Sequence, residues 1–511
     1  MNFRYFFVLL LSLILVIYFF VNVFENIYLK LTLIVTMLIG CIVIFCLYKK
    51  FNNKKLLVAF SMIVLIIITS LNIFGRVLAL DSLKEFNGKD VAIRARISSN
   101  YSFSSSGNLK IIISDIEISS GEKYTKINGK LDFYIEKNNL DLTKIEVGKI
   151  FETKTTINFY NYSTMTNKNK LSNSVIGYGF SNSSDFKIVD STRLTLKELA
   201  NNYVYTKFCS WNMEYAGLGL AMIFGNTAYI GGEISEIFNN VGIAHLVAVS
   251  GLNISILIGI FTFILKKLKL SKKSQLVTNF VILFIYSYLC NFTISVVRAM
   301  VMALLSLYGK MRGKPTDNLS ICSFSASMFL IINPFLLFNY SFILSYSTVL
   351  MITLLYKTLK RFFDKIFYKS LSDSISLTLS VESWLVFVQI YLFKTFPLVS
   401  ILSNTFLVPI AVFAFELLLI FTPIALILPF MSFTLKSFDI LMSIVIRFGN
   451  WLNGIGTILT ISNISLITVV LTFLFLLILS DYVFENKKTK CLSLVGLTAI
   501  IIGFQLICSI I

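Results

Sequence analysis

The sequence predicts a polytopic α-helical membrane protein that carries one all-β insert. Hydrophobic residues make up 56% of the 511 residues and charged residues only 14%, so most of the surface must face lipid. Apolar runs of about 20 residues, the length needed to cross a hydrocarbon core, recur from residue 6 to the end. One long polar stretch, residues 81–194, interrupts them and alternates apolar with polar residues, as strands do.

The basic residues predict the orientation in the membrane. The net charge is +19, and the positive residues gather in short loops between apolar runs: Lys49–Lys55, Lys266–Lys273, Lys310–Lys314, Lys357–Lys369 and Lys487–Lys490. Such loops are typical of the cytoplasmic side. We therefore expect a cytoplasmic N-terminus, three helices within residues 1–80, and an insert that lies outside the cytoplasm.

The insert is expected to form a small barrel or sandwich. Short alternating runs are separated by Asn, Gly and Ser clusters, and read "DVAIRARIS", "LKIIISDIEI", "GKLDFYIE" and "IFETKTTINFY". About five such strands in roughly 110 residues suit either a small barrel or a sandwich. The tail of the insert, residues 161–186, is rich in Asn and Ser and is expected to loop back to the membrane.

The second half is expected to be helical again. Residues 195–215 suggest an interfacial amphipathic helix capped by Ser191 or Thr192, and residues 216–480 a helical domain. All six prolines lie in this half and are expected to break helices beside a cavity. The 36 residues between Lys273 and Lys310 predict two short helices. Residues 481–511 are expected to hold a basic loop and a last helix.

The stretch "AHLVAVSGLNISIL", residues 244–257, contains the single histidine of the chain. If residues 244–260 are helical, His245 lies on one face and Ser250 and Asn253 on another, with Gly251 between them. Polar side chains at such positions either join helices by hydrogen bonds or carry function. A Ser–His dyad is disfavoured, because five helical residues separate the two side chains by about 140°.

Arg298 is a second outlier, within "TISVVRAMVMALL". An arginine near mid-span costs at least about 2.5 kcal/mol, so it should face the bundle interior or a wet cavity unless it reaches the cytoplasmic surface. Glu382 and Glu416 are similar, and either is a partner for Arg298 or Lys394. No phosphate-binding loop or hydrolase motif is visible, so we expect no enzyme, cofactor or metal.

These motifs resemble those of a known family. "GIAHLVAVSGLNISIL" resembles the HLxA(I/V)SGLH signature of the ComEC-type competence proteins, except that Asn253 stands where a second histidine is usual. "SVVRAMVMALL" is similar to SxxRAxxM, and "INPFLLFNYSFILSYS" to NPxxxxxxGFxLSF. "FPLVSILSNTFLVPI" resembles a later segment of the family. The metallo-β-lactamase-like domain of many members, which is rich in histidine, is expected to be absent.

The resemblance implies a channel in the bacterial cytoplasmic (inner) membrane that passes single-stranded DNA into the cytoplasm during natural transformation. It implies an OB-like insert that receives the strand through Arg94, Arg96, Tyr101, Phe103 and Lys110. It also implies a path lined by His245, Ser250, Gly251, Asn253, Ser295, Arg298 and Asn404.

The implied partners are single-stranded DNA, membrane lipid, an external DNA receptor, a cytoplasmic helicase or ATPase, and a separate nuclease. The alternative is a secondary transporter or lipid flippase for a small anionic substrate, which would use the same buried arginine but need no OB-like insert. A structural scaffold would leave the polar residues without a role.

Overall fold

The computed structural model describes most of the chain, namely residues 5–22, 54–99, 101–103, 108–119, 124–136, 145–182, 185–192, 194–313, 316–455, 458–461 and 464–480. The predicted second N-terminal span and the predicted last helix within residues 481–511 lie outside these ranges. Within them, seven helices are long and apolar enough to cross a membrane. The predicted polytopic helical protein is confirmed to that extent.

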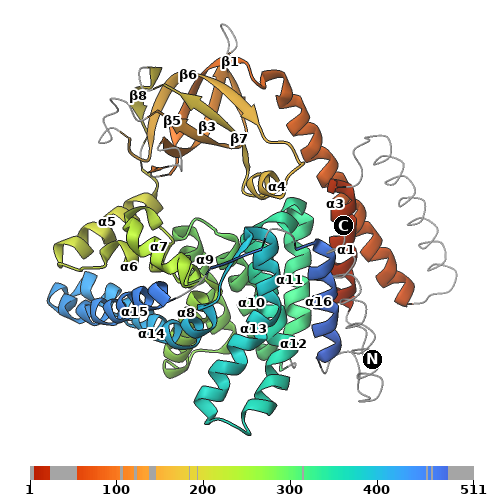
Figure 1. The fold of residues 1–511 in the computed structure, drawn as a ribbon, viewed down its shortest axis with the longest axis vertical. Helices are drawn as coiled ribbons and strands as arrows, with labels where there is room; N and C mark the ends of the chain where they lie inside the picture. Colours follow the sequence, from red (N-terminus) through yellow and green to blue (C-terminus); the bar gives the residue numbers. More distant parts are fainter. Residues whose placement is uncertain are drawn as a thin grey trace. The chain divides into compact units, whose positions relative to one another are not determined.

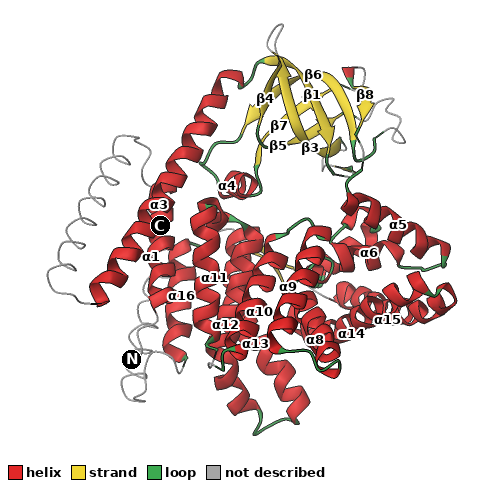
Figure 2. Cartoon of the chain, turned by 180° about the vertical axis from the view of Figure 1, so that it is seen from behind, coloured by secondary structure: helices red, strands yellow, loops and turns green. Residues whose placement is uncertain are grey.

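The chain divides into two compact units, which are described separately. The barrel unit comprises Arg4–Leu199 and Ser323–Ile343, and the helical unit comprises Ala200–Cys322 and the chain from Leu344 onward, together with the first three residues. Figure 2 shows that the long strands gather in one region and that helices make up the rest.

Five strands of the barrel unit close into a ring (Figure 1), in the order β1-β3-β5-β7-β6, with β6 pairing back onto β1. Their bounds are β1 (Asp90–Ile97), β3 (Leu109–Ser119), β5 (Lys130–Ile135), β6 (Lys149–Phe159) and β7 (Val175–Ser181). The β5–β7 pair is parallel and the other four are antiparallel. Three short strands, β2 (Ser102–Phe103), β4 (Tyr124–Ile127) and β8 (Lys187–Ser191), extend the sheet.

The core of the barrel follows from the alternation in the sequence. Every second residue of β1 is buried, and isoleucines of β1 and β3 point inward with Phe133 and Phe151, whose ring centroids are 5.4 Å apart. Gly177 lets β6 and β7 approach closely, since a Cβ at this position would lie 2.5 Å from the Asn158 carbonyl oxygen. The four predicted strand runs correspond to β1, β3, β5 and β6, so this part of the prediction is confirmed.

The tail of the insert was predicted wrongly as a loop. It forms the helix α4 (Met165–Ser172) and the ring strand β7. The Thr164 hydroxyl accepts a hydrogen bond from the Asn167 amide at 3.2 Å and so caps α4. The signal for β7 was present in "VIGYGFS", but its two glycines hid the alternation.

The family-like segment "NPFLLFNY" holds α4 in place. It forms the 3-10 helix η6 (Pro334–Phe338), and the Asn339 side-chain amide donates to Ser172 Oγ at 2.8 Å and to Asn173 Oδ1 at 3.1 Å. The Tyr340 amide donates to Asn169 Oδ1 at 3.1 Å. A sequence segment from the second half of the chain therefore completes the barrel unit.

A second tie joins α3 (Lys54–Asp81) to the end of α11 (Asn318–Ile332). The Asn72 side-chain amide donates to the carbonyls of Ile331 and Ile332 at 3.0 and 2.9 Å, and Arg76 donates to Ile332 at 3.3 Å. The last carbonyls of a helix have no partner within it, so these bonds satisfy groups that would otherwise be left open.

The helix α5 (Leu196–Ser210) begins at a capping box, one turn later than expected. The Thr195 amide donates to Glu198 Oε2 at 2.7 Å, and the Glu198 amide donates to Thr195 Oγ1 at 3.5 Å. Arg96 of β1 lies 3.1 Å from the same carboxylate and also donates to Thr192 Oγ1. The predicted cap at Ser191 or Thr192 is therefore wrong.

Acidification should weaken this attachment of α5 to β1. Burial raises the pKa of the Glu198 carboxyl, but hydrogen bonds from Thr195 and the charge of Arg96 outweigh burial, and the net pKa is lowered. A carboxyl with a lowered pKa stabilises the fold above its unfolded pKa, and this contribution is lost as the pH falls through the folded pKa. Glu198→Gln should lower the unfolding temperature at neutral pH and have little effect at about pH 3.

The measurement is thermal unfolding of the full-length protein in detergent across this pH range. Glu85→Gln, at an exposed position in the same unit, is the control. A destabilisation by Glu198→Gln that is the same at both pH values would contradict the ionic explanation.

The helical unit contains α6 to α10, most of α12, and α13 to α16. Their bounds are α6 (Ala216–Phe224), α7 (Gly232–Asn240), α8 (Gly251–Lys267), α9 (Lys272–Leu289), α10 (Ile294–Met311), α12 (Tyr340–Phe363), α13 (Lys369–Phe393), α14 (Ser400–Ile427), α15 (Lys436–Ile455) and α16 (Leu466–Leu479). One buried core joins α6, α7, α14 and α15, and a second joins α8, α9 and α10.

The predicted pair of short helices between the basic clusters is confirmed. Helices α9 and α10 have 18 residues each and are joined by a tight turn in which Asn291 and Phe292 have positive φ.

The expectation that prolines break helices does not hold at every proline. Pro409 and Pro423 lie inside α14, which continues past both, so the expectation of broken helices is wrong there.

Candidate functional site

The histidine-containing stretch precedes a helix instead of forming one. Residues Ala244–Leu246 form a 3-10 turn, and α8 begins only at Gly251, with Ser250 as its cap accepting from the Leu252 amide at 3.2 Å. The expected helix over residues 244–260 is therefore wrong for residues 244–250. Just before this segment, Gly242 has a φ of +81°, and a Cβ there would lie 2.6 Å from Ser400 Cβ, so the position favours glycine.

Ser250 and Asn253 attach α8 to the end of α6. The Ser250 hydroxyl donates to Asn253 Oδ1 at 3.1 Å, and the Asn253 side-chain amide donates to the Met222 carbonyl at 2.9 Å. The Tyr286 hydroxyl donates to the next carbonyl, that of Ile223, at 2.8 Å. The bonds from Asn253 and Tyr286 satisfy two of the last carbonyls of α6, so Asn253 acts as the interhelical hydrogen-bond partner considered from the sequence, whereas the described bonds of Ser250 stay within the start of α8.

Gly251 makes room for Arg298. A Cβ at Gly251 would lie 2.9 Å from Arg298 Nη2, so any other residue there would push the end of the Arg298 side chain from its observed position. Arg298 Nη1 donates to the Ser345 carbonyl at 2.8 Å, and the Tyr346 ring centroid lies 5.4 Å from the guanidinium carbon. Three family-like motifs, far apart in the sequence, therefore meet at one arginine.

The charge of Arg298 is not neutralised within the described part of the chain. The residue is 5% exposed, its Nε is buried without a hydrogen bond, and no described carboxylate forms an ion pair with it. A buried, unpaired charge costs several kcal/mol. The arrangement therefore favours an anionic ligand that would complete the guanidinium's hydrogen bonds. Ser295, one turn earlier on α10, is half-buried.

His245 stands apart from this cluster. Its side chain is exposed, as are Ala248 and Leu252, and no hydrogen bond in the described structure links it to Ser250. Ser250 instead donates to Asn253. The geometry does not assemble a nucleophile and base from these two residues.

Asn404 belongs to a second polar cluster. Its side-chain amide donates to Glu382 Oε1 at 2.7 Å. Neither Glu382 nor Glu416 forms an ion pair with Arg298 or Lys394 in the described structure, and Lys394 lies over the Tyr391 ring at 5.6 Å. Sequence reasoning identified Asn404 but not its partner, because the contact depends on how α13 crosses α14.

The basic residues predicted on the insert are largely engaged with acidic neighbours. Arg96 pairs with Glu198, and Arg94 lies 3.6 Å from Glu152 on the surface. Tyr101 is 38% exposed. Phe103 lies in β2, where its backbone pairs with Leu109, and the position of its side chain is outside the described structure. Lys110, also among the predicted residues, lies beside a cluster of aromatic rings.

We call Tyr134, Tyr160, Tyr178 and Phe180 the aromatic cluster. Tyr134 and Phe180 stack at 5.0 Å, Phe180 contacts Tyr178 edge-on at 5.8 Å, and Tyr178 contacts Tyr160 at 5.6 Å. Sequence reasoning missed it, although residues two apart on β7 share one face and could have revealed Tyr178 and Phe180.

Two lysines surround this cluster. Lys110 Nζ lies 5.6 Å from the Tyr134 ring centroid, and Lys110 and Lys170 lie 3.4 and 2.7 Å from Asp132 Oδ2. Burial and then the Asp132 carboxylate raise the pKa of Tyr134, so its hydroxyl stays neutral. Aromatic faces beside a net positive charge suit stacked bases with phosphates.

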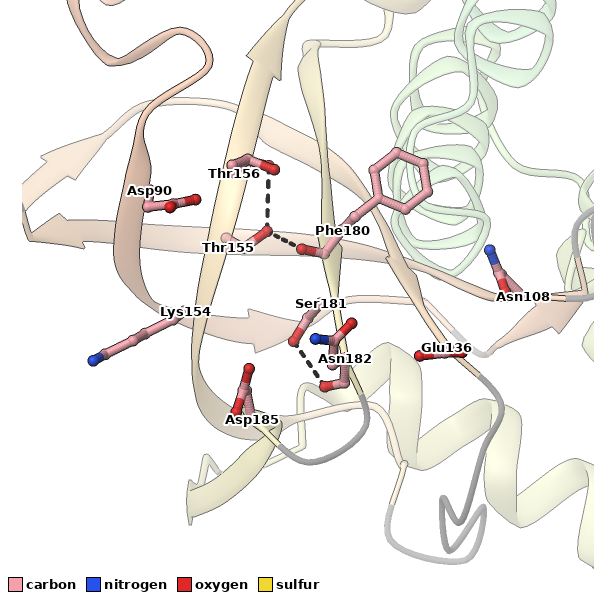
Figure 3. Close-up of a pocket in the computed structure, with 10 residues that line it drawn as sticks. All are labelled: Asp90, Asn108, Glu136, Lys154, Thr155, Thr156, Phe180, Ser181, Asn182 and Asp185. Carbon is pink, nitrogen blue, oxygen red and sulfur yellow. Dashed lines mark hydrogen bonds between the residues drawn. The ribbon is translucent and has the colours of Figure 1, made fainter.

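A hollow on the barrel lies next to Phe180 (Figure 3) and has a volume of about 600 Å³. Its lining contains three carboxylates, Asp90, Glu136 and Asp185, against one lysine, Lys154. Figure 3 shows the Lys154 side chain pointing away from Ser181 and Asn182. The hollow is therefore acidic and unsuited to a phosphate backbone, which leaves the aromatic cluster as the better candidate surface for an anionic ligand with aromatic rings.

The chain was compared with known proteins. The family model described as "Competence protein" matches residues 222–483, slightly more than half of the chain. The chain is 24% identical over 204 residues to "ComE operon protein 3" of Bacillus subtilis (strain 168), across 39% of this chain and 25% of that protein. The match thus spans about a quarter of the relative's length. No solved structure matches.

The matched region contains the segments in which Gly251, Arg298 and Ser345 meet, and the seven apolar helices agree with a multi-pass membrane protein. The chain belongs to the Competence protein family.

Proposed function

We propose that this protein passes single-stranded DNA across the bacterial cytoplasmic (inner) membrane during natural transformation. The observation that carries the proposal is Arg298, a buried guanidinium with no counter-ion among the described residues, at the point where three family-like motifs meet. Two oxygens of one phosphate group can accept two parallel N–H hydrogen bonds from one arginine side chain. Membership of the competence family and the similarity to a ComE operon protein support DNA as the source of that phosphate.

The proposed path is built around Gly251 and Arg298. Gly251 gives the guanidinium space, and Ser250, Asn253 and Ser295 belong to the two segments that meet there, the start of α8 and the helix α10. His245, exposed on the segment before α8, would contact the strand by hydrogen bonding, and Asn404 would lie farther along. Phosphates would pass Arg298 one at a time, each replacing water as the partner of the buried charge.

The barrel would receive the strand outside the cytoplasm. A closed five-stranded ring with one parallel pair supports an OB-like assignment, since the OB fold is a five-stranded Greek-key barrel that binds oligonucleotides. The aromatic cluster with Lys110 and Lys170 provides faces for bases and charge for phosphates. In this proposal Arg94 and Arg96 contribute less, because each already faces a glutamate.

Phe180→Ala should weaken the binding of single-stranded DNA by about 1–3 kcal/mol, because stacking of one base on an aromatic ring is worth that much. Phe180 is 47% exposed, so its removal leaves the barrel core intact. Fluorescence anisotropy with labelled oligonucleotide and the full-length protein measures the change. Tyr124→Ala, at a 51% exposed position on β4, is the matched control and should bind as wild type. Equal loss in both variants would argue against the aromatic cluster.

The organisation proposed for the whole chain keeps the sequence-based boundaries. Three helices within residues 1–80 precede the outside barrel of residues 81–194, an interfacial helix over 195–215 leads into the channel domain of 216–480, and residues 481–511 hold the last helix. Energy would come from a cytoplasmic helicase or ATPase, DNA from an external receptor, and strand degradation from a separate nuclease.

The decisive test is the import of labelled DNA into the cytoplasm of cells that carry the wild-type gene or a deletion. Surface-bound DNA that never reaches the cytoplasm in the deletion strain supports the channel. Unchanged import in that strain would favour transport of a small anionic solute or lipid, for which Arg298 is an equally suitable headgroup site.

A further inference from the structure

Glu382 is a carboxyl group buried in a helix that is long and apolar enough to span a membrane. It lies on α13 and is 5% exposed. Its single described hydrogen bond comes from the Asn404 side-chain amide of α14 at 2.7 Å. The DNA path proposed above makes no use of this carboxyl, so its presence inside the helical unit needs a separate explanation.

Two acceptor atoms of this pair lack a donor within the described part of the chain. Glu382 Oε2 and Asn404 Oδ1 are both buried, and no described group donates a hydrogen bond to either. Asp439, a buried carboxylate in the same unit, differs sharply: its two oxygens each accept a backbone N–H at 3.1 Å, from Glu214 and Tyr215. Asp439 therefore has the surroundings of a charged group, and Glu382 does not.

No cation neutralises Glu382 from the elements packed against it. Helix α16 and the strand β9 (Thr395–Pro397) carry no ionisable side chain, and α14 carries only Glu416, about 18 Å along the helix from Asn404. On α13 itself, Asp373 pairs with Lys360, and Lys394 is about 18 Å from Glu382 along the axis. An ionised Glu382 would be an isolated buried charge, which is the costliest arrangement.

We propose that Glu382 and Asn404 form a proton-binding site within the membrane domain. Hydronium delivers one proton to Glu382 Oε2 and leaves as water, and the new O–H is the one donor that the pair lacks. The neutral carboxyl and the amide then each offer one donor and one acceptor to the other. This site goes beyond the proposed function and does not depend on DNA.

The site has a physical connection to the motif region. Ser403, next to Asn404, donates to the Val241 carbonyl, and Ser400 packs against Gly242. Val241 and Gly242 begin the segment that leads to Ser250 and α8. Loss of the proton leaves a bare carboxylate beside the first turns of α14, so the packing of α14 on α13 and the position of this segment depend on protonation.

Infrared spectroscopy of the full-length protein in lipid bilayers at neutral pH tests the site directly. The wild type should show the C=O band of a protonated carboxyl, Glu382→Gln should lose it, and Asp373→Asn, a paired surface carboxylate on the same helix, should keep it. Asn404→Leu should keep the band but shift it, because the amide partner is gone. A spectrum of Glu382→Gln that matches wild type in this region would overturn the proposal.

A second measurement separates a proton from a metal cation. Glu382→Gln offers a carbonyl acceptor and an N–H donor in place of those of the protonated carboxyl and cannot lose the proton, so its unfolding temperature should fall less than that of the wild type as the pH rises above neutrality. Stabilisation of the wild type by sodium, with no protonated-carboxyl band, would instead assign the site to a cation and refute the proton. Neither readout involves DNA, so failure here leaves the channel proposal untouched.

Discussion

Arg298→Met should reduce the import of DNA into the cytoplasm by about 10- to 100-fold, because a hydrogen bond to a charged group contributes about 1.5–3 kcal/mol. Methionine fills a similar volume without the charge. No described carboxylate pairs with Arg298, so removing the arginine leaves no buried negative charge without a partner. We therefore expect the abundance of the protein to stay at the wild-type level. Arg298→Lys keeps the charge but loses the planar fork, so we expect intermediate import.

The measurement compares surface-bound with cytoplasmic labelled DNA in cells expressing equal amounts of each variant. Arg447→Met is the matched control, since Arg447 is an exposed arginine on α15 of the same unit. Import at the wild-type level by Arg298→Met would remove Arg298 from the path, and with it the main support for the channel.

Gly217→Ala should prevent stable folding of the helical unit. A Cβ at Gly217 would lie 1.9 Å from the carbonyl oxygen and 2.6 Å from the carbonyl carbon of Tyr229, and backbone atoms cannot rotate away as a side chain would. Helix α6 is buried along most of its length, so it has no free side toward which to move. Overpacking of this kind costs about 3 kcal/mol, and more where the backbone must shift.

Gly259→Ala provides the control for that substitution. Gly259 lies on α8 with nothing within 4 Å of the added Cβ, and alanine in a helix is favoured over glycine by about 0.5–1 kcal/mol. Thermal unfolding and membrane abundance should therefore fall for Gly217→Ala and hold or rise for Gly259→Ala. Equal stability of the two variants would mean that η4 (Thr227–Tyr229) can leave α6 without cost.

Much of the fold was predictable because it depends on local patterns. The alternation in β1, β3, β5 and β6 and the length between two basic clusters were enough to place four strands and the α9–α10 hairpin. The start of α8 was missed because the apolar run continues from residue 244 through residue 260, whereas the structure begins the helix after the Ser250 cap. The strand β7 was missed because its two glycines, one of which allows β6 and β7 to approach closely, interrupt the alternation of apolar and polar residues.

The candidate site was predictable only as a set of residues. Arg298 and Gly251 were identified from their unusual position in apolar sequence, but their contact and the role of Ser345 depend on the packing of α8, α10 and α12. Arg94 and Arg96 were chosen by charge alone, and acidic partners such as Glu198, in a distant segment, were not visible from the sequence. The charge of a residue identifies it as a candidate for binding an anion, but only the tertiary contacts show whether an acidic side chain already pairs with it.

The bonds between α4 and the segment around η6 impose an order on biosynthesis. Asn169 and its partner Tyr340 are 171 positions apart in the chain. At ribosomal speeds of about 5–20 residues per second, the insert waits roughly 10 to 30 s after its own synthesis before that partner exists. During this interval the polar groups of α4 that later bond to Asn339 and Tyr340 must be hydrated or bound by a chaperone. Substitutions at Asn339 remove some of these bonds and should prolong the time during which proteases can cleave the insert.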